Sequence, residues 1–160
     1  MTKWLRATVT GAVGIAAVFI VLVAPAGAGT TQVSGIGLPL GPDPCNGQTS
    51  DFTIEMTGSL VGCWYATITE SKFNPSGTYQ ERGTETFVGC LNVTTCGTFS
   101  TAYTFTAKFV DDTFTQEIHG RCHHPIVSGS GIGGFSGATG MINFKDDVEA
   151  GIFRYTGHIG

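Results

Sequence analysis

The chain has 160 residues and a formal net charge of −4 at pH 7, and only 12% of its residues are charged. It has no cluster of basic residues, so nucleic acid and anionic membrane surfaces are excluded as expected partners. The 132 residues that follow position 28 are enough for one domain with a single hydrophobic core.

The first 28 residues have the pattern of a targeting segment. Two basic residues, Lys3 and Arg6, precede an apolar stretch over 7–24 and the box Ala26-Gly27-Ala28, which is typical of a cleaved signal peptide. A retained membrane anchor is the alternative, since 18 apolar residues are near the lower limit for spanning a bilayer. Glycines within the stretch favour cleavage because they weaken a helix. We expect export, cleavage after Ala28, an extracellular location and no membrane segment in the mature protein.

Residues 29–51 combine several glycines with Pro39, Pro42 and Pro44 and show no apolar periodicity. Proline and glycine at this density are typical of loops and linkers. The segment is therefore predicted to be an arm in front of a folded domain over 52–160.

From Phe52 onward the apolar residues follow a period of two, which indicates β-strands, and no long window has a helical stripe. Seven or eight short strands in one small domain predict a sandwich or a barrel. We favour a closed antiparallel barrel of about eight strands, because pairing of the last strand with the first removes the exposed edges. A barrel of this size is filled by side chains or holds one small ligand. The expected strands cover 52–60, 64–70, 79–88, 99–109, 114–122, 141–144 and 152–159.

The segment 127–144 holds six glycines before a strand pattern resumes. One spacing, Gly129-x-Gly131-x-x-Gly134, matches a dinucleotide-binding fingerprint, but that motif requires a helix to follow. Ser136 likewise fails the nucleophile-elbow pattern, which needs glycine on both sides. The glycines are therefore predicted to form a structural corner between two strands, because glycine can adopt φ above zero and also lets other atoms approach closely. The corner residues are Gly131, Gly133, Gly137 and Gly140.

The chain resembles the allene oxide cyclase and dirigent superfamily of β-barrels over residues 52–159. The resemblance is carried by Gly131-x-Gly133-x-Phe135-x-Gly137-Ala138-x-Gly140, an alternating strand, and then Phe153-Arg154-Tyr155-Thr156-Gly157. It implies a calycin-like barrel of eight antiparallel strands with a largely apolar lumen, often assembled as a dimer or trimer. Characterised members are plant proteins that steer cyclisation or radical coupling of apolar substrates, and bacterial secreted relatives are the nearer comparison. No motif transfers their catalytic residues to this chain.

Five cysteines follow the targeting segment, and export favours disulfide bonds. Cys90 and Cys96 flank the tip of a predicted hairpin, so we expect them to pair with each other. The pairing of Cys45, Cys63 and Cys122 stays open, and one of the three must remain unpaired or bond elsewhere. The chain lacks the doubled C-x₂-C spacing of a cysteine-only metal site.

Histidines concentrate at the end of the strand over 114–122 and just after it. Alternation places His119 and His123 on one face and Cys122 and His124 on the other, so at most two histidines converge. Zinc needs a further ligand. We therefore predict no metal and no cofactor.

Two rows of polar residues are the candidates for acid–base chemistry. Directed into a barrel, they would lie in a low-dielectric pocket that shifts pKa values. Directed outward, they would form an ordinary polar surface, and this orientation is predicted because Phe114, Ile118 and Cys122 take the opposite face of one strand. The candidate catalytic residues are Glu117, His119 and Arg121 in one row, and Glu81 and Glu85, with Tyr79, in the other.

These observations predict a secreted β-barrel that acts as a binding or scaffold module for a small apolar ligand or a cell-envelope partner. The alternative is a cofactor-free cyclase or isomerase of the allene oxide cyclase type. A third possibility is an envelope protein that works through its outer surface. Carboxylate or histidine groups that face inward would favour an enzyme, and a continuous lumen cavity would favour a ligand or substrate.

Overall fold

The computed structural model describes residues 29–160, and the predicted targeting segment 1–28 lies outside the described residues. The described chain has no α-helix, and within it no helix has the length and apolar character needed to cross a membrane. The strands are β1 (Thr31–Gly41), β2 (Phe52–Gly58), β3 (Leu60–Asn74), β4 (Thr78–Leu91), β5 (Thr95–Phe109), β6 (Glu117–Pro125), β7 (Ile132–Gly133), β8 (Gly140–Asp147) and β9 (Ile152–Ile159).

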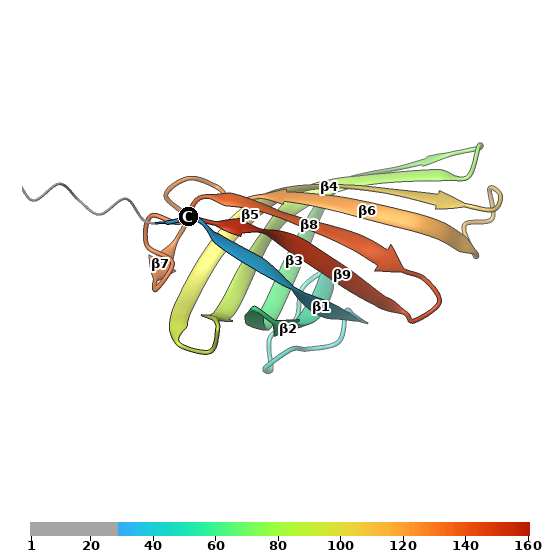
Figure 1. Ribbon diagram of the computed structural model, residues 1–160. Coiled ribbons are helices and arrows are strands. Elements are labelled where there is room, and N and C mark those ends of the chain that lie inside the picture. Colours follow the sequence, from blue (N-terminus) through green and yellow to red (C-terminus); the bar gives the residue numbers. More distant parts are fainter. Residues whose placement is uncertain (1–28) are drawn as a thin grey trace, which may run out of the picture.

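Eight of these strands form a closed antiparallel barrel, which confirms the predicted architecture (Figure 1). The strand order is β4-β3-β2-β1-β9-β8-β6-β5, and β4 pairs with β5 to close the ring. The short β7 adds to β5 at Gly97 and Thr98. At one end of the barrel the β3–β4 and β5–β6 hairpins extend beyond β8 and β9 (Figure 1). We call this end the open end.

The prediction of an arm is wrong for residues 31–41. They form the barrel strand β1, which pairs with β2 and β9. The apolar period is missing because two inward positions are glycines. A Cβ at Gly35 would lie 2.5 Å from the Tyr155 hydroxyl oxygen, and one at Gly37 would lie 2.7 Å from Ile54 Cγ2. Large side chains of the neighbouring strands therefore fill the space that β1 leaves empty.

An aromatic cluster fills the end of the lumen opposite to the open end. Trp64 is fully buried, with its ring centroid 5.6 Å from those of Phe87 and Phe99. Phe135, from the segment between β6 and β8, packs edge-on against both phenylalanines at 5.8 Å and 5.0 Å. We call this the closed half of the lumen.

The glycine-rich segment 126–139 gives Phe135 its position. Gly133, Gly137 and Gly140 have φ of 67°, 79° and 137°, a region that glycine occupies with little strain. A Cβ at Gly140 would lie 2.1 Å from the His158 carbonyl oxygen, whereas one at Gly137 would meet no atom within 4 Å. The segment thus joins two neighbouring strands and also folds across the end of the barrel.

Two disulfide bonds are present, and the predicted pair Cys90–Cys96 is confirmed. These residues face each other across the β4–β5 hairpin. Cys45 pairs with Cys63 and forms with Tyr65 a second small core outside the lumen. Cys122 is buried and unpaired. Disulfides that persist indicate an oxidising environment.

Candidate functional site

A cavity of about 260 Å³ lies in the half of the lumen nearest the open end. We call it the lumen cavity. One part of its wall is apolar and mostly aromatic, and the rest carries hydroxyl, carboxyl, imidazole and thiol groups. The apolar lining consists of Phe52, Ile54, Ala66, Phe105, Phe144 and Phe153, and the polar lining of Tyr79, Glu81, Glu85, Tyr103, Glu117, Cys122, His124 and Asp146.

Glu81 and Glu85 line this cavity, so the prediction that they face outward is wrong. Strand alternation places Glu81, Gly83, Glu85 and Phe87 on the inner face of β4. Gly83 leaves room for an aromatic side chain, because a Cβ there would lie 2.7 Å from Tyr103 Cε1. The inner face of β4 therefore changes from aromatic to acidic toward the open end.

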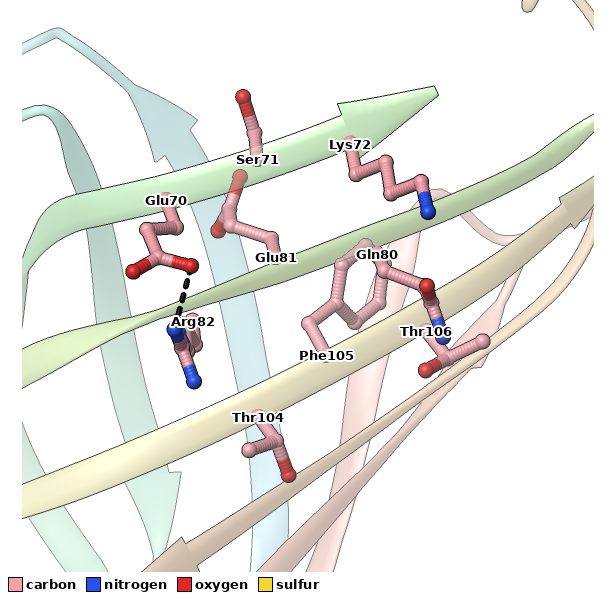
Figure 2. A pocket seen from close by; sticks show the side chains of 9 residues that line it. All are labelled: Glu70, Ser71, Lys72, Gln80, Glu81, Arg82, Thr104, Phe105 and Thr106. Carbon is pink, nitrogen blue, oxygen red and sulfur yellow. Dashed lines mark hydrogen bonds and ion pairs between the residues drawn. The ribbon is translucent and has the colours of Figure 1, made fainter. Parts of the chain in front are cut away.

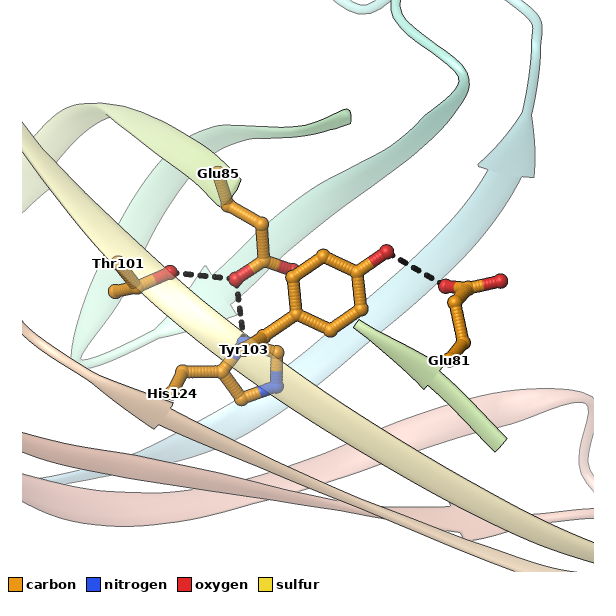
Figure 3. A network of polar contacts seen from close by, with 5 residues as sticks. All are labelled: Glu81, Glu85, Thr101, Tyr103 and His124. Carbon is orange, nitrogen blue, oxygen red and sulfur yellow. Dashed lines mark hydrogen bonds and ion pairs between the residues drawn. The ribbon is translucent and has the colours of Figure 1, made fainter. Parts of the chain in front are cut away.

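Glu85 forms a fully buried network at the inner end of the cavity (Figure 3). Its Oε2 accepts hydrogen bonds from Thr101 Oγ1 at 2.5 Å and from His124 Nδ1 at 2.6 Å. His124 is only 1% exposed, and its ring packs against Phe144 with a centroid distance of 4.3 Å. In a neutral ring this bond puts the proton of His124 on Nδ1, and in a protonated ring the contact is an ion pair with Glu85. His124 Nε2 is buried and has no partner.

Glu81 lies nearer the open end and accepts hydrogen bonds from two tyrosines. Tyr103 donates to Oε1 at 2.6 Å, and Tyr79 donates to Oε2. Burial and the bond to Glu81 raise the pKa of Tyr79 to about 12 and also raise that of Tyr103. Both phenols therefore keep their protons at neutral pH and act as hydrogen-bond donors.

Glu117 and Asp146 form a pair of carboxyl groups over Gly120. A Cβ at Gly120 would lie 2.2 Å from Asp146 Oδ2 and 2.7 Å from Glu117 Oε1, so glycine is needed for both groups to fit. Burial, and then the neighbouring Glu117, raise the pKa of Asp146 to about 8. Asp146 is therefore a group that exchanges a proton near neutral pH.

A bulge in β6 separates Glu117 from His119 and Arg121, although strand alternation predicts all three on one face. Glu117 pairs with Phe109 and His119 with the adjacent Lys108, so Ile118 is an extra residue. Glu117 consequently lines the lumen cavity, whereas Ile118, His119 and Arg121 are exposed. Phe114, predicted on the opposite face of the same strand, lies in the preceding turn.

The rest of β6 follows the predicted alternation. Cys122 and His124 are buried on the inner face, and His123 is exposed. Burial and nearby carboxylates raise the pKa of the Cys122 thiol, so this thiol is a poor nucleophile. No group of three or more His, Cys, Asp or Glu side chains among the described residues is arranged to hold a metal ion.

Two hollows on the outer surface are less suited to a site. One lies over β3, β4 and β5, where Glu70 and Arg82 form an ion pair at 2.5 Å (Figure 2). Both side chains are more than 60% exposed, and exposed ion pairs of this kind contribute little to the stability of the fold. The other hollow holds His119, Arg121 and His123 on the outside of β5 and β6. Both hollows are lined mostly by exposed side chains of the outer surface, so the lumen cavity, which is lined by buried and half-buried side chains, is the stronger candidate.

Three residues of the site, Thr101, Tyr103 and Asp146, are not singled out by the sequence. Tyr103 lies in the strand predicted over 99–109, but its hydroxyl gives no indication of a carboxylate partner on β4. Asp146 lies two residues after Phe144 and thus on the inner face of β8. That spacing is a usable signal.

A scan against protein-family models and a search of curated proteins found no match to this chain. Function is therefore inferred from the geometry of the lumen.

Proposed function

We propose that the protein binds a small, largely apolar molecule in the lumen cavity. The observation that carries this proposal is the cavity itself, about 260 Å³ in volume and lined by aromatic rings beside a few polar groups. Apolar concave sites with few convergent polar groups are typical of small-molecule binding. His124, whose Nε2 is buried and has no partner, lines the same cavity.

The cavity volume limits the size of the ligand. Water occupies about 30 Å³ per molecule in the liquid, so the cavity has room for roughly ten non-hydrogen atoms. Larger molecules would have to extend through the open end. The closed half offers no further space because Trp64, Phe87 and Phe99 fill it.

Indole is a suitable neutral probe, and Ala66 is the position at which to block its binding. Ala66 lines the cavity and is buried, so Ala66→Phe should fill the space and abolish indole binding in an NMR titration. Thr67→Phe on the outer face of the same strand is the control and should retain binding. Equal indole affinity in the two variants would contradict the proposal.

A second candidate function is acid–base isomerisation without a cofactor. It is favoured by the Glu85–His124 contact and by Asp146, whose pKa is raised to about 8 by burial and by Glu117. Groups that exchange protons near neutral pH are suited to general acid–base catalysis. A carboxylate in the cavity would take a proton from the α-carbon of a ketone, and the proton would return at the γ-carbon.

This function is tested with a β,γ-unsaturated cyclohexenone, whose conversion to the conjugated isomer is followed by ultraviolet absorbance. Glu85→Gln and Asp146→Asn should each remove the accelerated rate, and Glu55→Gln on the exposed face of β2 should retain it. A rate equal to that of buffer alone would leave the protein a binding module.

The proposal also includes export of the protein, its family and its assembly. Two disulfides support an exported protein, in line with the predicted signal peptide. An eight-stranded barrel is the fold that the resemblance to allene oxide cyclase and dirigent proteins implies, and one fold serves many functions. From that resemblance we propose assembly as a dimer or trimer.

A further inference from the structure

We propose that the molecule bound in the lumen cavity is a small organic cation, with an N–H-bearing ammonium or amidinium group on an apolar body. This inference rests on the proposed binding function and specifies its ligand. Three features of the lining support it: several carboxyl groups, buried polar atoms without hydrogen-bond partners, and aromatic rings.

Four carboxyl groups line the cavity: Glu81, Glu85, Glu117 and Asp146. None of the lining residues in the described chain is Lys or Arg, and His124 is the only lining residue that can become cationic. Asp146 keeps a proton at neutral pH because of its raised pKa and shares it with Glu117, but the ionised carboxylates of the group are costly to bury without a positive partner. A cationic ligand would supply that partner, whereas an anionic ligand would add to the repulsion.

Three buried polar atoms of the lining have no partner apart from the proton that Glu117 and Asp146 share. They are Glu117 Oε1, Asp146 Oδ1 and His124 Nε2. In a neutral ring that donates from Nδ1 to Glu85, Nε2 of His124 is an acceptor. Unsatisfied buried acceptors call for a ligand that donates hydrogen bonds. A charged nitrogen group donates several and accepts none.

The aromatic side chains of the cavity wall also favour a positively charged ligand. Phe105 and Phe144 line the cavity beside Tyr79 and Tyr103, and the faces of aromatic rings attract cations. A bare metal ion fits less well, since no group of three potential ligand side chains converges among residues 29–160. An organic cation uses both features of the wall, because its apolar body contacts the rings and its charged group reaches the carboxylates.

Benzamidinium, benzamide and benzoate test this inference, because they share one shape and differ in charge. Their affinities for the unmodified protein are measured by isothermal titration calorimetry at one pH and salt concentration. Benzamidinium should bind at least tenfold more tightly than benzamide, and benzoate should give no measurable heat of binding.

The double variant Glu117→Gln/Asp146→Asn keeps the shape of the acidic pair and removes its charge. It should lose at least tenfold in benzamidinium affinity and should keep its benzamide affinity within about twofold. Glu55→Gln removes an exposed charge from the outer face of β2 and should leave both affinities unchanged. The three ligands still decide the matter on the unmodified protein when the double variant does not fold.

The outcomes separate the inference from the function on which it rests. Equal affinities for benzamidinium and benzamide, or preference for benzoate, would overturn the cationic ligand while lumen binding stands. Absence of binding by all three ligands and by indole would overturn the binding function itself. Tenfold weaker benzamidinium binding by Glu55→Gln would show attraction to the general surface charge and would overturn the inference.

Discussion

The closed half of the lumen and the lumen cavity are built by the same strands but carry different side chains. β4 contributes Phe87 to the closed half and Glu85 to the cavity, two residues apart on one face. β5 contributes Phe99 to the closed half and Tyr103 to the cavity. The lumen thus changes from a buried aromatic core to an acidic pocket within a few residues along each strand.

This difference shows that strand alternation decides only which side chains enter the lumen. Position along the strand decides whether an inward side chain packs in the aromatic core or lines the lumen cavity. The closed half gains stability from apolar burial, whereas the buried acids of the cavity cost stability. Substitutions in the two halves should therefore have opposite profiles: large losses of stability in the closed half, and changes of pH dependence and ligand affinity in the cavity.

The largest effect is expected for Phe135→Ala, which empties the closed half. Phe135 is 2% exposed and packs on Phe87 and Phe99. Removal of a buried phenylalanine ring should lower the free energy of unfolding by about 3–5 kcal/mol, measured by urea denaturation. Phe73→Ala at the open end is the control, since Phe73 is 58% exposed. A similar loss in both variants would show that the two ends do not differ in packing.

A smaller effect is expected in the glycine-rich segment, where Gly140→Val should destabilise more than Gly137→Val. Both residues have φ above zero, but only at Gly140 would an added Cβ meet a carbonyl oxygen, at 2.1 Å. Backbone strain should cost about 1–3 kcal/mol at Gly140 and near the lower end of that range at Gly137. Thermal melts give the order, and indole titration should show unchanged affinity in the folded protein. Abolished binding at an unchanged melting temperature would identify the segment as a binding loop.

The smallest effect is a pH dependence of the free energy of unfolding that arises from Asp146. It is expected for the lumen cavity and not for the apolar closed half. Burial and Glu117 raise the pKa of Asp146 to about 8, whereas an unfolded aspartate titrates near 3.9. The folded state therefore holds the extra proton between these values, so this contribution to stability falls as the pH rises toward 8. Partial solvent access screens the charge, and we expect a loss of about 1–2 kcal/mol from pH 5 to pH 9.

Asp146→Asn should flatten this decline, because asparagine does not titrate. Urea denaturation across pH 5 to 9 measures it, with Asp147→Asn as the exposed-side control, since Arg154 already lowers the pKa of Asp147 and keeps it ionised in that range. An undiminished slope in Asp146→Asn would assign the pH dependence to other groups facing the cavity. Those groups are Glu81, Glu85, Glu117, Cys122 and His124.

Much of the barrel could be predicted from the sequence because most strands alternate apolar and polar residues. The Cys90–Cys96 bridge was predictable since both residues flank one hairpin tip. The faces of Cys122 and His124 were also correct, because β6 is regular beyond its bulge. Local patterns of this kind need no knowledge of distant strands.

The errors arose where the inner face lacks the expected apolar side chains. β1 turns Gly35 and Gly37 inward, because Tyr155 and Ile54 occupy the space from neighbouring strands. The predicted outward orientation of Glu81 and Glu85 was wrong for a related reason. β4 turns both side chains inward toward partners on β5 and β6. A single extra residue at Ile118 then reversed the face expected for Glu117. Such long-range partners and bulges leave little trace in one sequence.

The position of the unpaired Cys122 has a consequence for how the disulfides form and persist. A chain that enters an oxidising compartment from its N-terminus presents Cys45, Cys63, Cys90 and Cys96 before Cys122. The two bridges close loops of sequence separation 18 and 6, so both can form before the fifth thiol arrives. Once β6 turns Cys122 into the lumen, its raised pKa suppresses the thiolate that attacks disulfides. The folded barrel thereby protects its bridges from thiol–disulfide exchange with its own odd cysteine.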